Sequence, residues 1–162
     1  MAHSFHAHFV HVVFSTRHRQ PWLTVEIRQR LWKVMHGILK KHGIDSIAIG
    51  GYEDHCHALI SLPSTESVAK TVKTLKGTSS KWLSDEYPEL RSFAWQVGYA
   101  EFSVSTSQLK KVIEYIANQE EHHMNISFHD EYVAFLRANN IVFDERSVFF
   151  DQSRSAPDPA HD

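Results

Sequence analysis

Segments with the two-residue hydrophobic period of a strand alternate along this chain with segments that have the 3.6-residue period of a helix. Strands are predicted over residues 5–15, 44–52, 55–63 and 92–105, and helices over residues 23–42, 66–84, 107–123 and 130–141. The order strand-helix-strand-strand-helix-strand, followed by further helices, is that of the ferredoxin-like (RRM-like) fold. We therefore predict an α+β domain in which an antiparallel sheet has helices on one face. The other face of the sheet should be open to a ligand or a partner.

The length and composition fit one folded domain. A chain of 162 residues with 42% hydrophobic residues can bury a core of its own. We place the domain at residues 1–150 and expect the polar, proline-containing residues 151–162 to form a disordered tail. No apolar run reaches the roughly 20 residues of a membrane helix, and the N-terminus lacks a signal-peptide pattern. With Cys56 as the single cysteine, these features indicate a cytoplasmic protein without an internal disulfide.

The charge balance argues against a positive electrostatic potential over the whole domain that would attract nucleic acid. The formal net charge is −2, from 17 Lys and Arg against 19 Asp and Glu. The last twelve residues contain three aspartates and one arginine, so residues 1–150 carry 16 charges of each sign. Phosphate binding on such a domain must come from local clusters of basic side chains.

The segment "EDHCHALISLP" places His55 and His57 on one face of a predicted strand. The two side chains are separated by roughly 7 Å along the strand, so both imidazoles could bind one metal ion, while Cys56 points to the other face. Chance is an alternative, because a chain with 13 histidines should contain about one such pair, and this chain also has His6 and His8. The spacing alone leaves a metal site and a pair of core histidines both open.

The helix predicted over residues 107–123 presents Tyr115, Gln119 and His122 as one stripe beside its apolar face. A tyrosine at this border is half-buried and still accessible. Such a tyrosine often only covers the edge of a core, so periodicity does not decide whether Tyr115 is catalytic.

Four segments together carry a resemblance to a known family. They are "DHCHALISLP", "LKGTSSKWL" (75–83), "WQVGYAEFSVS" (95–105) and "VIEYIANQEEHH" (112–123), and they follow one another in the family's order. Over roughly residues 5–150 the chain resembles the single-tyrosine HUH transposases of the insertion sequence 200/605 type, named after a histidine, hydrophobic, histidine motif. The resemblance is specific, because it requires three features together: the histidine pair, the tyrosine, and a glutamine four residues after the tyrosine.

The resemblance implies roles for individual residues. His55, His57 and Gln119 would bind a Mg²⁺ or Mn²⁺ ion. Tyr115, on a helix that follows the sheet, would attack single-stranded DNA and form a 5′-phosphotyrosine intermediate, which a 3′-hydroxyl later resolves. These residue types suit the chemistry, because the ion offsets charge on the phosphate and the adduct stores the phosphodiester bond. The sequence does not identify a proton acceptor for Tyr115.

The resemblance also implies a homodimer that recognises single-stranded DNA with a hairpin near the end of a mobile element. Whether the histidines and the tyrosine of one site come from one subunit or from both stays open. Basic clusters are then candidate phosphate contacts, at Arg17, Arg19, Lys73, Lys76, Lys81, Lys110 and Lys111. For any one of these lysines, a solvated helix face is the more common explanation.

Three other functions stay open. A domesticated relative would keep the chemistry and process repetitive extragenic palindromes. A non-catalytic ferredoxin-like module would bind nucleic acid with exposed aromatic side chains and would need neither a metal nor Tyr115. A metal hydrolase is the third, although the sequence has no further histidine or carboxylate at an evident ligand spacing.

Overall fold

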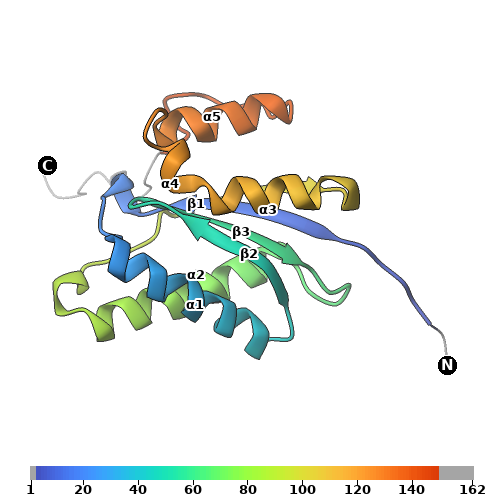
Figure 1. The fold of residues 1–162 in the computed structure, drawn as a ribbon, viewed down its shortest axis with the longest axis horizontal. Coiled ribbons are helices and arrows are strands. Elements are labelled where there is room, and N and C mark those ends of the chain that lie inside the picture. The colour runs from blue at the N-terminus through green and yellow to red at the C-terminus, as the bar shows by residue number, and fades with distance from the viewer. Residues whose placement is uncertain (1–2, 150–162) are drawn as a thin grey trace, which may run out of the picture.

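A computed structural model describes residues 3–149 of the chain and contains a four-stranded antiparallel sheet. The strands are β1 (Phe9–Ser15), β2 (Asp45–Gly51), β3 (His55–Ser61) and β4 (Ala100–Val104). Their order across the sheet is β2-β3-β1-β4, and each neighbouring pair is antiparallel (Figure 1). This order confirms the ferredoxin-like prediction and puts β1 and β3 at the centre of the sheet.

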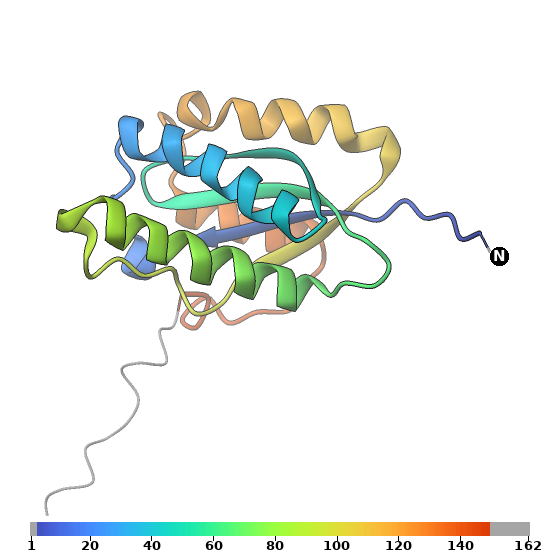
Figure 2. The same cartoon turned by 90° about the horizontal axis from the view of Figure 1, so that it is seen from below.

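Helices α1 (Val25–Lys41) and α2 (Val68–Glu86) cover one face of the sheet (Figures 1 and 2). The side chains of Thr24 and Ser67 cap the N-termini of these helices by accepting hydrogen bonds from first-turn N–H groups. Alternate side chains of β1 and β3 point into this core, namely Val10, Val12, Phe14, Cys56, Ala58 and Ile60. The residues between them, which include the histidine pair, therefore face the opposite side of the sheet.

The second face of the sheet is also covered, by α3 (Leu109–Ala117), α4 (Gln119–His122) and α5 (Phe128–Ala138). Figure 1 shows these helices on the side opposite α1 and α2. A second apolar core forms there from Val13, Ala100, Phe102, Phe128, Tyr132 and Leu136. The expectation of an open sheet face is therefore wrong, because these strand side chains are apolar and α5 removes them from water.

The last strand is shorter than the predicted range of 92–105. Phe93 and Trp95 pack into the core beneath α1 and α2, and Trp95 pairs with Thr16 through an isolated bridge. Beyond Gly98, Phe102 points into the second core. Residues 96–99 separate this segment from β4.

The helix predicted over residues 107–123 is divided. A 3-10 turn (Thr106–Gln108) leads into α3, and Asn118 leaves the helical conformation with φ −101° and ψ 22°. Helical hydrogen bonding resumes at once, since the N–H of His122 donates to the carbonyl of Asn118. Tyr115 and Gln119 consequently lie on different helices, α3 and α4.

Two further 3-10 turns, Arg17–Arg19 and Pro88–Leu90, complete the elements of residues 3–149. The predicted tail, residues 151–162, and the predicted domain end at residue 150 lie outside the described residues. Within the described part of the chain, the helices are too short or too polar to cross a membrane.

Candidate active site and metal centre

His55 and His57 lie on β3 and point to the face covered by α3, α4 and α5. Both side chains are 0% exposed, and their ring centroids are 5.1 Å apart. Cys56, between them, is buried in the opposite core beside Met35. The predicted same-face geometry of the two histidines is therefore confirmed.

Gly50 on β2 allows α3 to lie directly against the sheet. It is the register partner of His57, so it sits beside the histidine pair. A Cβ atom at position 50 would lie 2.7 Å from the carbonyl oxygen of Ile116, which leaves no room for a side chain. This close approach brings Tyr115 over the histidines, with the ring centroids of Tyr115 and His57 5.7 Å apart.

Gln119 enters the same space from the start of α4. Its Oε1 atom lies 2.8 Å from Nε2 of His55 and 2.9 Å from Nε2 of His123. Its amide nitrogen donates to the carboxylate of Glu131 at 3.3 Å and to the carbonyl of Tyr115 at 3.4 Å. The fold thus brings together Tyr115, Gln119 and the histidine pair.

Glu131, on α5, lies at the centre of this cluster and is 2% exposed. Its Oε1 atom is 2.8 Å from Nε2 of His57 and 3.5 Å from Nε2 of His55. Its Oε2 atom accepts the hydroxyl hydrogen of Tyr115 and lies 3.2 Å from Nε2 of His123. One carboxylate therefore joins the tyrosine to the histidines.

Burial and the Glu131 carboxylate set the protonation states of the cluster. Burial raises the pKa of Tyr115 above its ordinary value, and the charge of Glu131 raises it further. Burial alone would also raise the pKa of Glu131, but hydrogen bonds with His123 and His57 outweigh it and hold this pKa below its usual range. Burial lowers the pKa of His57 to about 4. At neutral pH, Glu131 is therefore ionised and Tyr115 is protonated.

The Nδ1 atom of each motif histidine, which points away from the cluster, has a hydrogen-bond partner. Nδ1 of His55 donates to Oδ1 of Asp54 at 2.7 Å. Nδ1 of His57 lies 2.8 Å from Nε2 of His11, a residue of β1. Burial, and then the neighbouring imidazole of His57, lowers the pKa of His11 to about 3. Both arrangements direct the Nε2 atoms of the motif into the cluster.

The cluster has the donor atoms of a divalent cation site. Single ligand atoms of His55, His57, His123 and Glu131 lie within 4.8 Å of one another. Nδ1 of His55 carries the ring proton and donates it to Asp54, so Nε2 of His55 has a lone pair. This lone pair faces Oε1 of Gln119 at 2.8 Å. Two lone pairs at this distance repel unless a cation or a proton lies between them. These residues therefore fit a bound metal ion.

His123 and Glu131 are candidate ligands that the sequence prediction missed. The view that no further histidine or carboxylate stands at ligand spacing is wrong, because both residues reach the pair through the fold. Glu131 does carry one signal in the sequence. It lies between Phe128 and Tyr132 on the apolar face of α5, where a carboxylate is rarely buried without a partner.

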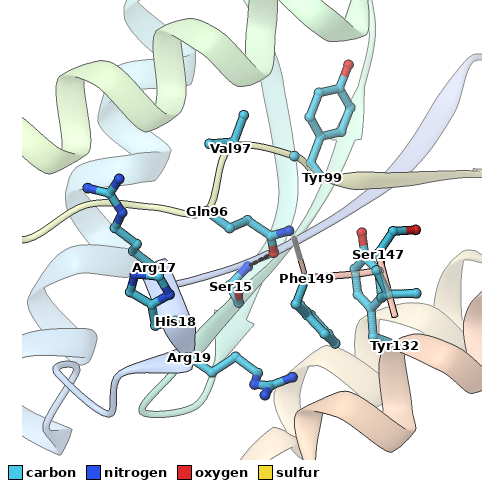
Figure 3. A pocket seen from close by; sticks show the side chains of 12 residues that line it. Ser15, Arg17, His18, Arg19, Gln96, Val97, Tyr99, Tyr132, Ser147 and Phe149 are labelled. Carbon is cyan, nitrogen blue, oxygen red and sulfur yellow. Dashed lines mark hydrogen bonds between the residues drawn. The ribbon is translucent and has the colours of Figure 1, made fainter. Parts of the chain in front are cut away.

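Two of the predicted DNA-binding residues, Arg17 and Arg19, line a cavity of about 390 Å³ (Figure 3). They come from the turn that follows β1, and the guanidinium of Arg19 lies 4.5 Å from the ring centroid of Phe149. Oε1 of Gln96 accepts a hydrogen bond from the Ser15 N–H at 2.5 Å, as Figure 3 shows. That bond fixes the Gln96 amide at the wall of the cavity.

The predicted lysines of α2 differ in their surroundings. Lys73 is exposed and lines a second hollow of about 380 Å³, which shares Gln96, Val97 and Tyr99 with the first. The ammonium of Lys76 donates to the carbonyls of Gln96 at 2.7 Å and Gly98 at 2.9 Å. Burial lowers the pKa of Lys76 to about 8.

The remaining predicted lysines lie away from these hollows. Lys81 is exposed on α2 and pairs with Asp85 at 2.6 Å. Lys110 and Lys111 are exposed at the start of α3. The structure therefore gathers Arg17, Arg19, Lys73 and Lys76 around the segment 96–99 and leaves Lys81, Lys110 and Lys111 apart.

Comparison with known proteins gives the family. The family described as "Transposase IS200 like" matches residues 4–119. The ISDra2 transposase TnpA of Deinococcus radiodurans is 25% identical over 116 residues, which cover 68% of this chain and 83% of that protein. A crystal structure of a candidate transposase from D. radiodurans R1 has a TM-score of 0.61 at 22% identity, covering 74% of this chain and 96% of that one. The structure of a REP-associated tyrosine transposase bound to a REP hairpin has a TM-score of 0.56 at 15% identity, and the match covers 76% of this chain and 72% of that one.

The family match includes the histidine pair, Tyr115 and Gln119, and it ends before α5 and Glu131. The two structural neighbours have the same fold. The sequence match and the fold agree, and this chain belongs to the IS200-like transposase family.

Proposed function

We propose that this transposase depends on a divalent metal ion and cleaves and rejoins single-stranded DNA at hairpin-marked ends, through a 5′-phosphotyrosine intermediate on Tyr115. The observation that carries the proposal is the meeting of Tyr115, Gln119 and Glu131 with His55 and His57 in one buried cluster. Burying so many polar groups is costly, and such clusters concentrate at functional sites.

His55, His57 and Gln119 hold the metal ion in this proposal, and Glu131 and His123 are close enough to join them. Imidazole nitrogens together with amide and carboxylate oxygens suit Mn²⁺, and the oxygen ligands also suit Mg²⁺. The bound ion supplies positive charge that offsets the charge developing on the scissile phosphate.

Tyr115 is the nucleophile. Its oxygen forms the bond to phosphorus, while the 3′-oxygen of the preceding nucleotide leaves with the bonding electrons and becomes a hydroxyl. The Tyr115 hydroxyl donates to Oε2 of Glu131, and Nε2 of His122 lies 3.2 Å from the same hydroxyl, so both groups are within reach of its proton. A hollow of about 470 Å³, lined by Tyr115, Asn118 and His122, gives a DNA strand access to this side chain.

The two hollows beside the segment 96–99 are the proposed DNA-binding surface. Arg17, Arg19 and Lys73 supply positive charge for phosphates, and Tyr99 offers an aromatic face for an unpaired base. The neighbour that is bound to a REP hairpin supports DNA with a hairpin as the partner. Lys76 acts in this proposal as a structural residue that holds the segment 96–99.

Incubation with Mn²⁺ and labelled single-stranded hairpin DNA from the flanks of the gene tests the proposal. We expect a denaturation-resistant protein–DNA adduct that EDTA prevents. Tyr115→Phe should abolish the adduct and leave hairpin binding nearly unchanged, because only a hydroxyl is removed. Tyr99→Phe is the matched control, since it removes a hydroxyl outside the cluster. An adduct on Tyr115→Phe would disprove the nucleophile, and an adduct in EDTA would disprove the metal requirement.

A second candidate function is favoured by the likeness to the REP-associated tyrosine transposase. In this alternative a domesticated enzyme uses the same cluster to process dispersed extragenic palindromes. The surrounding DNA distinguishes the two. Hairpin-ended boundaries on both sides of the gene indicate a mobile element, and palindromes scattered elsewhere without such boundaries indicate the domesticated enzyme.

A further inference from the structure

His11 lies directly behind the motif histidine His57 and takes no part in the proposed ligand set. It is on β1, next to β3 in the sheet, and is 3% exposed. Its Nε2 atom is 2.8 Å from Nδ1 of His57. At this distance one of the two nitrogens carries the hydrogen and the other accepts it.

A cation at Nε2 of His57 decides which nitrogen carries the hydrogen. A neutral imidazole that binds a metal through Nε2 has its proton on Nδ1. Nδ1 of His57 must then donate, and the only role left for Nε2 of His11 in this contact is that of acceptor. His11 must in turn carry its own proton on Nδ1.

If no cation lies between His57 and Glu131, their contact requires the opposite placement. Oε1 of Glu131 lies 2.8 Å from Nε2 of His57, and an ionised carboxylate only accepts hydrogen bonds. Nε2 of His57 therefore carries the proton, and Nδ1 of a neutral His57 accepts from Nε2–H of His11. Each ring holds one proton in both states, so the pair keeps its two protons and its zero charge.

The ring of His11 is held in place to perform this role. Its centroid lies 5.3 Å from that of Phe135 at an interplanar angle of 84°, and 6.3 Å from that of Phe102 at 66°. Such edge-to-face contacts fix the ring plane without competing for a hydrogen bond. The other motif histidine has a different partner, since Nδ1 of His55 donates to the carboxylate of Asp54.

We propose that His11 is a positioning residue that fixes the tautomer of the metal ligand His57, and that the two histidines exchange tautomers together when a divalent cation binds. This inference rests on the metal site of the proposed function. It assigns to a neutral imidazole the task that Asp54 performs for His55.

Nitrogen-15 NMR of histidine-labelled wild type, before and after addition of Mg²⁺, tests the exchange directly. We expect the Nε2 signal of His11 to move from the protonated to the unprotonated range as Mg²⁺ binds. The ring nitrogens of His36, which bonds to Ser46 on the other side of the sheet, should stay unchanged as an internal control. Saturation with Mg²⁺ without a change at His11 would overturn the inference.

Calorimetric titration with Mn²⁺ tests the positioning role without measuring cleavage. His11→Phe removes the acceptor and keeps an aromatic ring, and it should weaken Mn²⁺ binding about 10- to 100-fold. His11→Gln offers an amide oxygen as acceptor and should recover most of the affinity, whereas a loss as large as that of His11→Phe would overturn the inference. Thermal unfolding of each variant shows whether it is folded.

The outcomes separate this inference from the proposed function. Undiminished Mn²⁺ binding by a folded His11→Phe overturns the role of His11 and leaves the metal site intact. A wild type that binds neither Mn²⁺ nor Mg²⁺ overturns the metal site itself, and the inference with it.

Discussion

At the scale of single residues, the buried histidines should make stability depend on pH. Burial holds the pKa of His57 at about 4 and that of His11 at about 3, below the 6.5 of an ordinary imidazole. Between pH 6.5 and pH 4 the unfolded chain therefore binds more protons than the folded one, so these two groups lower the free energy of unfolding as the pH falls. Urea denaturation at pH 7 and pH 5 measures the effect.

His123 acts in the opposite direction, so the comparison of variants is the sharper test. Burial lowers the pKa of His123, but the hydrogen bond with Glu131, the charge of Glu131 and a hydrogen bond with the backbone of Ile126 together raise it above its ordinary value. The contribution of His123 to stability is therefore lost as the pH rises. His11→Phe should reduce the loss of stability between pH 7 and pH 5, because it removes one of the histidines whose pKa is lowered in the folded protein. His8→Phe changes an exposed histidine and should not. Equal losses in the wild type and His11→Phe would contradict the prediction.

Substitutions of Lys73 and Lys76 should have different effects: the first on DNA binding, the second on the stability provided by the segment 96–99. Lys76→Met removes the hydrogen bonds to the carbonyls of Gln96 and Gly98, so we expect the free energy of unfolding to fall by about 1 kcal/mol. Lys73→Met changes an exposed side chain and should leave stability nearly unchanged. It should weaken hairpin binding and reduce the slope of log affinity against log salt by about 1. A salt slope that Lys73→Met leaves unchanged would remove Lys73 from the proposed surface.

At the scale of elements, the contact of β2 with α3 should control the position of Tyr115. Gly50→Ala places a Cβ atom 2.7 Å from the carbonyl oxygen of Ile116, so α3 must shift. We expect a loss of about 1–3 kcal/mol in stability and a larger fractional loss of adduct than of hairpin binding. Gly37→Ala in α1 is the matched control, since a Cβ atom there meets nothing within 4 Å. It should be neutral or stabilising, and normal adduct yield from Gly50→Ala would contradict the prediction.

The elements also show why some of the site could be predicted from the sequence and some could not. His55 and His57 were predictable, because strand alternation alone puts them on one face of β3. Helix periodicity likewise placed Tyr115 beside His122, and their side chains do meet at 3.2 Å. The break at Asn118 was not predictable, because the residue interrupts helical dihedral angles while the hydrogen bonding continues across it.

Glu131 belongs to the unpredictable part for a different reason. It reaches His57 across 74 residues of sequence, because α5 folds back over the sheet. No local pattern encodes that return. The same packing explains the covered second face, since the apolar residues of α5 were visible in the sequence but the surface they cover was not.

At the scale of the whole molecule, the resemblance implies a homodimer, and the subunit origin of the residues in each of its active sites can be tested. In the described chain, Tyr115 lies over His57 of the same chain, with ring centroids 5.7 Å apart, and its hydroxyl donates to Glu131 of the same chain. We therefore expect each site to take its histidines and its tyrosine from one subunit, whatever the oligomeric state. The resemblance alone left both arrangements open.

Mixing two inactive variants decides between the arrangements. His57→Ala protein and Tyr115→Phe protein, differently tagged, are mixed until co-purification proves that subunits have exchanged. If each site is built from one chain, every site keeps one lesion and no adduct forms, which is the result we expect. If sites are shared, one site of each mixed dimer is intact, and because half of the dimers are mixed, about a quarter of all sites should form an adduct. Recovery near that level would show that the tyrosine helix serves the partner in solution, whereas its absence after proven exchange would support the single-chain site.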